Sequence, residues 1–201
     1  MAPQIYLITP ADPDLVEFPR RLMAVLAGPE VAAILVQRGT LNDEDYARLG
    51  ERVVQIGQAA GAAVLVEDDV ELAQRLGADG VHVGEGGTKA IRAAVGALKP
   101  NGIVGAGAVN SRHDAMSFGE LDVDYLFFGP LGGASDPQAA EFAQWWAETF
   151  EIPAVHSDPQ AEPDQLTATG AEFIALSDSV WSAADPAKAL AALVDATRDR
   201  S

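Results

Sequence analysis

The chain has 201 residues, with 13 Lys or Arg against 30 Asp or Glu, so its formal net charge is −17. This acidic balance argues against binding to duplex nucleic acid or to an anionic membrane surface, because both partners require a basic patch. The sequence contains no cysteine, which excludes disulfides, thiolate metal sites and a cysteine nucleophile.

Short apolar segments recur from one end of the chain to the other. They are rich in Val, Ile, Leu and aromatic residues and are apolar on both alternating faces. This pattern is typical of strands that are buried on both sides of a parallel sheet. The eight predicted strands cover residues 4–9, 32–36, 62–66, 79–83, 102–107, 124–128, 152–156 and 172–176.

Segments with helical periodicity lie between these strands. Apolar residues between positions 15 and 26 recur at spacings of three and four, as on one face of a helix. A further helix is predicted over residues 88–98, before a Lys-Pro-Asn-Gly sequence that stops it. Two later helices are predicted to begin after Asp136-Pro137 and Asp185-Pro186, because proline is favoured in the first turn.

The spacing of the strands predicts the fold. Successive strands begin far enough apart to hold a strand, a loop, a helix and a second loop. Eight such units with parallel strands form a (β/α)₈ barrel of the TIM type, and this is the predicted fold class, α/β. A doubly wound open sheet is the alternative. No linker or change of composition divides the chain, so we predict a single barrel domain over residues 1–201.

The most specific stretch of the sequence is VLVEDDVELAQRLGADGVHVG at residues 64–84. It resembles the thiamine phosphate synthase family, which shares its barrel with the bacterial thiazole tautomerases. The YLIT sequence of the first strand, Asp124-Tyr125 at the start of the sixth and Gly129-Pro130 at its end are similar to the same family. The resemblance extends over nearly the whole chain and is strongest between residues 60 and 130.

The resemblance implies a transferase of thiamine biosynthesis, which joins an aminopyrimidine pyrophosphate to a thiazole phosphate and expels pyrophosphate. The leaving group departs, a pyrimidine cation forms, and the thiazole nitrogen attacks it. Such chemistry needs Mg²⁺ and cationic side chains to stabilise the pyrophosphate as charge accumulates. The resemblance also implies a homodimer, for which an exposed Trp145 or Trp146 on the aromatic sixth helix would be an anchor.

Carried over position by position, the resemblance implies roles for residues at the carboxyl ends of the strands. Asp68 has an alternative role as a helix N-cap. Gln37 and Arg38 are adjacent, so only one of them can face the barrel axis. The implied substrate-binding residues are Gln37, Arg38, Glu67, Gly107, Gly129, His156 and Ser177, and the implied Mg²⁺ ligands are Asp68 and Glu85.

This chain departs from the family pattern at several of those positions. The second strand is followed by one Arg and no Lys, and Glu67 replaces a neutral Asn. Gly84-Glu85-Gly86-Gly87 replaces the loop that carries the second metal-binding Asp, and residues 131–136 lack the family's Lys. The candidate cations at the strand ends are Arg38, Lys89, Arg112 and His156, and the candidate anions are Glu67, Asp68, Asp69, Glu85, Asp136, Asp158 and Asp178.

An excess of carboxylates repels phosphorylated substrates unless a divalent metal intervenes. We therefore expect weak or lost synthase activity. The alternatives are a catalytically silent relative that binds a small molecule or a partner, and an enzyme of altered substrate with a carboxylate-rich metal site.

Three further features have open interpretations. His82 lies within a strand, where it is either catalytic or packed as a structural histidine. The glycine-rich run from Gly129 to Ser135 either wraps a phosphate or serves as a tight, mobile connection. No apolar run approaches the roughly 18 residues of a membrane span, and residues 1–10 lack the pattern of a secretory signal, so we expect a cytoplasmic protein.

Overall fold

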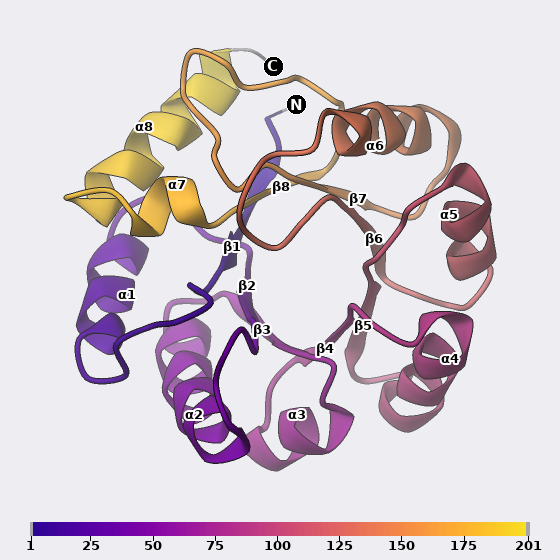
Figure 1. Cartoon of the computed structure of the whole chain (residues 1–201), viewed down its shortest axis with the longest axis horizontal. Helices are drawn as coiled ribbons and strands as arrows, with labels where there is room; N and C mark the ends of the chain where they lie inside the picture. The colour runs from indigo at the N-terminus through magenta and orange to yellow at the C-terminus, as the bar shows by residue number, and fades with distance from the viewer. Residues whose placement is uncertain (1, 200–201) are drawn as a thin grey trace.

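The computed structural model describes residues 2–199 as one closed barrel of parallel strands in the order β1 to β8 (Figure 1). Pairing of β8 with β1 closes the barrel. The strands are β1 (Gln4–Ile8), β2 (Ala33–Val36), β3 (Ala63–Glu67), β4 (Gly80–Val83), β5 (Ile103–Ala106), β6 (Tyr125–Phe128), β7 (Ala154–Ser157) and β8 (Phe173–Leu176). Each coincides with a predicted strand, so the predicted (β/α)₈ fold is confirmed.

Helices surround the barrel on all sides (Figure 1). They are α1 (Phe18–Leu26), α2 (Asp43–Ala59), α3 (Val70–Leu76), α4 (Gly87–Leu98), α5 (Arg112–Gly119), α6 (Pro137–Thr149), α7 (Asp178–Trp181) and α8 (Pro186–Asp199). The helices predicted after Asp136 and Asp185 begin there, and the Asp136 side chain caps α6 by accepting from the Gln138 N–H. Within residues 2–199, no helix is both long and apolar enough to cross a membrane.

The connection between β7 and β8 differs from the prediction of a helix in every unit. Residues 158–172 form turns and extended chain without a helix. Pro159 and Pro163 lie in this segment, and proline lacks the N–H that a helix interior requires. Two helices, α7 and α8, follow β8 instead.

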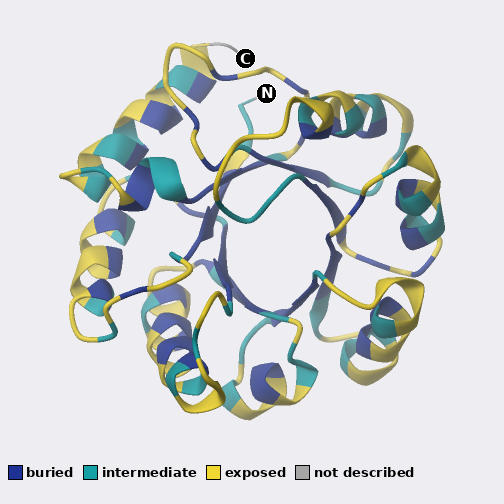
Figure 2. Ribbon diagram, viewed as in Figure 1, coloured by how far each residue is buried: buried dark blue, intermediate teal, exposed yellow. Residues whose placement is uncertain are grey.

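The strands form the buried centre of the molecule, whereas the helices bury only the faces that they turn toward the barrel (Figure 2). An inner cluster fills the barrel and includes Tyr6, Leu65, Tyr125 and Phe127. Outside the strands, two larger clusters pack them against the helices, and Trp146 of α6 is fully buried in one of these. Alternation along each strand therefore decides which side chains reach the barrel axis.

A chain of polar groups crosses the inner cluster. The Tyr6 and Tyr125 hydroxyl oxygens lie 2.8 Å apart, and His82 Nδ1 lies 3.0 Å from the Tyr125 hydroxyl. Burial lowers the pKa of His82 to about 4, so the imidazole is neutral near pH 7. Gly105 makes room for this chain, because a Cβ there would lie 1.9 Å from Tyr125 Cζ.

Candidate functional site

The candidate site lies at the mouth of the barrel, which we define as the opening at the carboxyl ends of the strands. The inner cluster contains Leu35, Leu65, Phe127, Val155 and Ala175. Two residues further along each strand, the chain again faces the axis, now at the mouth. The positions reached in this way are Gln37, Glu67, Gly129, Ser157 and Ser177, and the corresponding positions after β4 and β5 are Gly84 and Gly107.

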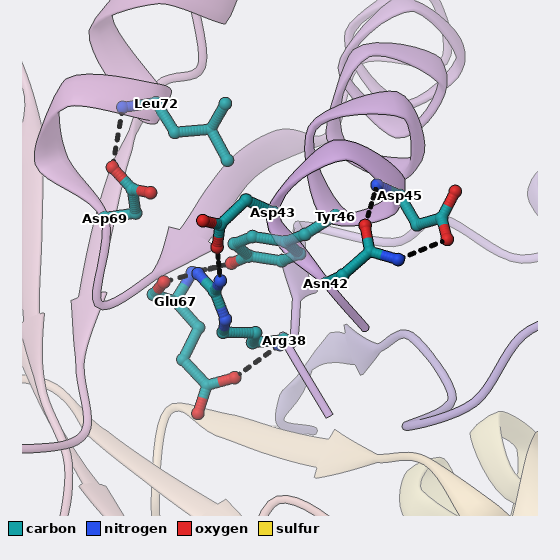
Figure 3. Close-up of polar contacts among 8 residues, drawn as sticks. All are labelled: Arg38, Asn42, Asp43, Asp45, Tyr46, Glu67, Asp69 and Leu72. Carbon is teal, nitrogen blue, oxygen red and sulfur yellow. Dashed lines mark hydrogen bonds and ion pairs between the residues drawn. The ribbon is translucent and has the colours of Figure 1, made fainter. Parts of the chain in front are cut away.

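Gln37 and Arg38 separate as alternation requires. Gln37 is buried, and its amide nitrogen donates to the Thr9 carbonyl oxygen. The Arg38 guanidinium instead forms an ion pair with Asp43 and lies over the Tyr46 ring, 5.1 Å from its centroid (Figure 3). Arg38 still contacts the mouth through its backbone, because its N–H donates to the Glu67 carboxylate over 2.6 Å.

Tyr46 of α2 holds the ends of β2 and β3 together. Its hydroxyl lies 2.9 Å from the Val36 carbonyl oxygen and 3.0 Å from the Glu67 carbonyl oxygen, and it accepts from the Glu67 N–H over 2.9 Å. Helical periodicity places this residue on the buried face of α2, but no local sequence signal predicts that it fixes the two strand ends.

Glu67 and Asp68 place two carboxylates at the end of β3. Asp68 has φ +51°, and its Oδ1 accepts from the Gly84 N–H over 2.8 Å and the Glu85 N–H over 3.2 Å. Asp69, not Asp68, caps α3 by accepting from the Leu72 N–H (Figure 3). The N-cap alternative for Asp68 is therefore wrong.

The pKa values of Glu67 and Asp68 are both raised, because the two carboxylates are partly buried close to other negative charges. Burial raises the pKa of Glu67, and the hydrogen bond from the Arg38 N–H partly offsets this effect. Burial also raises the pKa of Asp68, with a smaller contribution from the negative charge of Glu85. A divalent cation would relieve the repulsion among these groups.

The residues of this pair fit part of a magnesium site. A Cβ built on Gly84 would lie 3.2 Å from Asp68 Oδ2 and 3.7 Å from Glu67 Oε1, so both oxygens face the same point. Within residues 2–199, no group of three or more Asp, Glu or His side chains is placed to hold a metal. Mg²⁺ commonly binds one or two carboxylates together with substrate phosphates and water, which is what two convergent oxygens can support.

The glycines of the mouth have structural reasons to be glycine. A Cβ on Gly107 would lie 2.5 Å from His82 Nε2, so the family's serine would clash with the imidazole. Gly129 has φ +114°, and a Cβ there would lie 2.9 Å from the Ser157 carbonyl oxygen. Close packing at the end of the barrel therefore leaves no room for a side chain at Gly107 or Gly129.

The glycine-rich segment after β6 arches over the ends of β7 and β8 (Figure 1). The Gly133 N–H donates to Asp178 Oδ2 over 2.7 Å, and the Ser135 hydroxyl donates to Asp158. Beneath the arch, Ser177 is fully buried. This segment is anchored by carboxylates from the two neighbouring strand ends.

Two of the remaining candidate cations, His156 and Arg112, are directed away from the mouth. His156 alternates with the inward-facing Val155 and lines a cavity of about 180 Å³ outside the barrel, beside residues 166–171. Burial lowers the pKa of His156, and the charge of Asp158 partly opposes this effect. The Arg112 guanidinium lies 4.7 Å from the centroid of the Trp145 ring on α6, and Lys89 is exposed on α4.

The closed parallel sheet and the polar mouth identify the molecule as a (β/α)₈ barrel protein. Its candidate site lies at the carboxyl ends of the strands. The sequence model of the thiamine monophosphate synthase family matches residues 5–180, and the chain belongs to this family.

Individual relatives agree with that assignment. A thiamine-phosphate synthase of Hyphomonas neptunium is 34% identical, over 94% of this chain and 91% of its own length. One from Rhodospirillum centenum is 35% identical, over 97% and 96%. Among solved structures, a thiamine phosphate pyrophosphorylase from Pyrococcus furiosus superposes with a TM-score of 0.79 at 24% identity, over 98% of this chain and 96% of its own.

Proposed function

We propose that this chain is a transferase that joins an aminopyrimidine pyrophosphate to a thiazole, with low activity toward the thiazole phosphate used by its family. The relatives named thiamine-phosphate synthases support the reaction type. The observation that carries the proposal is the convergence of Glu67 and Asp68 oxygens on Gly84, at the mouth of a barrel of this family.

In the reaction, the C–O bond between the pyrimidine methylene group and pyrophosphate breaks, and its electron pair leaves with pyrophosphate. The thiazole nitrogen then forms the new C–N bond. We assign Gln37, oriented by its bond to Thr9, to hydrogen bonding with the aminopyrimidine. Arg38 can turn from Asp43 to the pyrophosphate at small cost, because an exposed ion pair contributes only about 0–1 kcal/mol.

We assign a Mg²⁺ ion to Asp68 and Glu85, with Glu67 supplying a further oxygen that converges with that of Asp68. When bound, the ion supplies positive charge that stabilises the leaving pyrophosphate. Asp68 suits this role because two backbone N–H groups hold its Oδ1 and leave Oδ2 directed at Gly84. Glu67 is likewise held by the Arg38 N–H through one oxygen and presents the other.

The low rate follows from missing positive charge. Removing one well-placed group that stabilises transition-state charge costs about 10²–10³ in rate. This chain lacks two lysines and one metal-binding Asp of the family pattern, and the Arg112 guanidinium packs on Trp145 of α6. These losses act on the same group, so they need not multiply.

We also propose that the protein works in the cytoplasm, where charged phosphate substrates are retained, and that it forms a homodimer through the face of α6 that carries Trp145. Trp145 is only partly buried, whereas Trp146 is fully buried. Sedimentation that finds only monomer at micromolar concentration would remove the dimer.

The test of the proposed function is steady-state product formation from the aminopyrimidine pyrophosphate and thiazole phosphate with Mg²⁺. We expect slow, Mg²⁺-dependent formation of thiamine phosphate, with kcat more than tenfold below about 1 s⁻¹, the low end of typical enzymes. A kcat within tenfold of that value would contradict the low activity. Binding of the pyrimidine pyrophosphate without any turnover would instead identify a catalytically silent relative.

A further inference from the structure

The mouth divides into two halves that differ in charge. Between Arg112 and Lys188 the sequence contains fourteen Asp or Glu residues and no Lys or Arg. This stretch includes β6, β7 and β8 together with the segments that follow them as far as the start of α8. This half, which we call the acidic half, therefore contributes no Lys or Arg of its own. The cations that contact it come from outside the stretch, with Arg112 over the Trp145 ring and Arg21 bonded to the Trp181 carbonyl oxygen.

Two carboxylates of the acidic half already occupy the groups that would hold an anion. In (β/α)₈ barrels, phosphate is frequently bound by the loops after the seventh and eighth strands. Here Asp158 and Asp178 stand in those loops, and they accept from the Ser135 hydroxyl and the Gly133 N–H. A phosphate dianion would have to displace these bonds and approach both negative charges.

A buried hydroxyl without a partner lies beside this arrangement. Ser177 is fully buried, with 0% of its surface accessible to solvent. Its Oγ has no hydrogen-bond partner in the described part of the chain. A Cβ on Gly132 would lie 3.7 Å from both carboxylate oxygens of Asp178 and 4.0 Å from Ser177 Oγ, so the two groups face the same α-carbon. A ligand hydroxyl placed there could satisfy Ser177, whose unmet hydrogen bond otherwise costs free energy.

Space for a small ring lies next to the same segment. A cavity of about 380 Å³ opens between the segment after β5 and the start of α6, with Val109, Pro130 and Phe142 in its walls. Among the described residues that line it, Asp136 is the charged one. The cavity can hold an apolar heterocycle and offers no positive charge to a phosphate.

We propose that the acidic half accepts an unphosphorylated thiazole whose side chain ends in a hydroxyl group, in preference to a thiazole phosphate. The hydroxyl donates to Asp178 and accepts from Ser177. This inference rests on the proposed function and names the substrate class of the same site.

The chemistry of the coupling step favours such an acidic wall. The thiazole enters neutral, and its nitrogen forms the C–N bond to the pyrimidine cation that remains after the C–O bond to pyrophosphate has broken. The positive charge then resides on the ring, which becomes a thiazolium cation. The bond-breaking electron pair leaves with pyrophosphate, and no proton is transferred. The Asp136 carboxylate in the wall of the cavity stabilises the developing cation, whereas Asp158 and Asp178 repel a phosphate on the side chain of the ring.

Calorimetric titration of the full chain with hydroxyethyl-methylthiazole, and separately with its phosphate ester, tests the inference. We expect the alcohol to bind about tenfold more tightly, which is the effect of a modest charge repulsion of about 1.4 kcal/mol. Equal or tighter binding of the phosphate, or no binding of either compound, would overturn the inference. Turnover with each compound is measured separately, so a preference for the phosphate with turnover removes this inference and keeps the proposed function.

A matched pair of variants tests whether Asp178 causes the preference for the alcohol over the phosphate ester. In Asp178→Asn we expect the preference to narrow by about tenfold, because one charge is removed while an acceptor for the Gly133 N–H is kept. Asp185→Asn removes an equal charge at the exposed start of α8 and should leave the preference unchanged. Chemical unfolding of both variants checks that they fold. In Asp158→Asn we measure the same preference for the alcohol over the phosphate ester, as an independent test of the second carboxylate. An unchanged preference in Asp178→Asn and Asp158→Asn would overturn the inference.

Discussion

The two halves of the barrel mouth use their carboxylates in opposite ways. At the end of β3, backbone N–H groups donate to one carboxylate oxygen of Glu67 and one of Asp68. The other oxygen of each carboxylate is directed at Gly84. In the acidic half, Asp158 and Asp178 are bonded to the arching segment after β6. Carboxylates thus converge in the way that our proposed Mg²⁺ site requires on one side, and they anchor a loop on the other.

Net charge alone therefore does not decide what a site binds. A carboxylate whose second oxygen converges with another can bind Mg²⁺ and so attract pyrophosphate. In the acidic half, Asp158 and Asp178 take up the Ser135 hydroxyl and the Gly133 N–H, which are donors that an anion would need, and they add repulsion. The convergence of two free carboxylate oxygens, and not the number of acids, distinguishes the end of β3 from the acidic half.

The largest expected effect is on the side of β3. Asp68→Asn should lower the rate of product formation by about 10²–10³, because the amide keeps the Gly84 and Glu85 hydrogen bonds but loses the charge that holds the metal. Initial rates over a range of Mg²⁺ concentrations measure the effect. Asp69→Asn is the matched control, since asparagine also caps a helix. Equal losses in both variants would contradict the assignment of the metal to Asp68.

Below the mouth, the neutral state of His82 predicts a pH dependence of stability. Its pKa is about 4 in the folded chain and 6.5 in the unfolded chain, so the unfolded state binds more protons between these values. The stabilisation is complete above pH 6.5 and is lost as the pH falls toward 4, by about 3 kcal/mol.

Urea unfolding at pH 7 and pH 4 measures this loss, and His82→Asn should lack it while it retains a polar contact with Tyr125. His113→Asn, at an exposed position, should behave like the unchanged chain. A wild-type pH dependence in His82→Asn would show that His82 is not the group responsible.

A smaller effect on stability is expected from the close packing of Gly107 against the His82 imidazole. Gly107→Ser should lower the free energy of unfolding by about 1–3 kcal/mol, because the new Cβ would lie 2.5 Å from His82 Nε2. Gly96→Ser is the control, since nothing lies within 4 Å of a Cβ at that helical position. If both variants are equally stable, the close approach of Gly107 to the imidazole does not constrain the mouth.

The smallest expected effect is that of salt on anion binding. Without Mg²⁺, the affinity for the phosphate ester should rise about two- to threefold when ionic strength increases from 0.01 M to 0.15 M, because salt screens the repulsion. The affinity for the thiazole alcohol should not change. Affinity for the phosphate that falls with salt would mean that cations dominate the acidic half.

The sequence predicts the fold well because burial on both faces is encoded locally. Each strand is a short apolar run, and the Asp-Pro starts of α6 and α8 are visible within two residues. The connection from β7 to β8 was predicted to hold a helix, and this prediction is wrong because spacing alone does not show that its prolines prevent one.

The candidate site is less predictable, because its contacts join residues far apart in the chain. The family pattern points to Gln37, Glu67 and Asp68, and alternation separates Gln37 from Arg38. The bond from Gly133 to Asp178 spans 45 residues, and no local pattern encodes it. The outward position of His156 depends on the register of β7, which places Val155 in the barrel interior.

A competition between the two thiazoles measures the substrate preference of the mouth directly. The full chain is incubated with the aminopyrimidine pyrophosphate, Mg²⁺ and equal concentrations of hydroxyethyl-methylthiazole and its phosphate ester, and the coupled products are separated by mass. We expect the unphosphorylated product, thiamine, to form faster than thiamine phosphate. Predominant formation of thiamine phosphate, or no product from either ring, would contradict it.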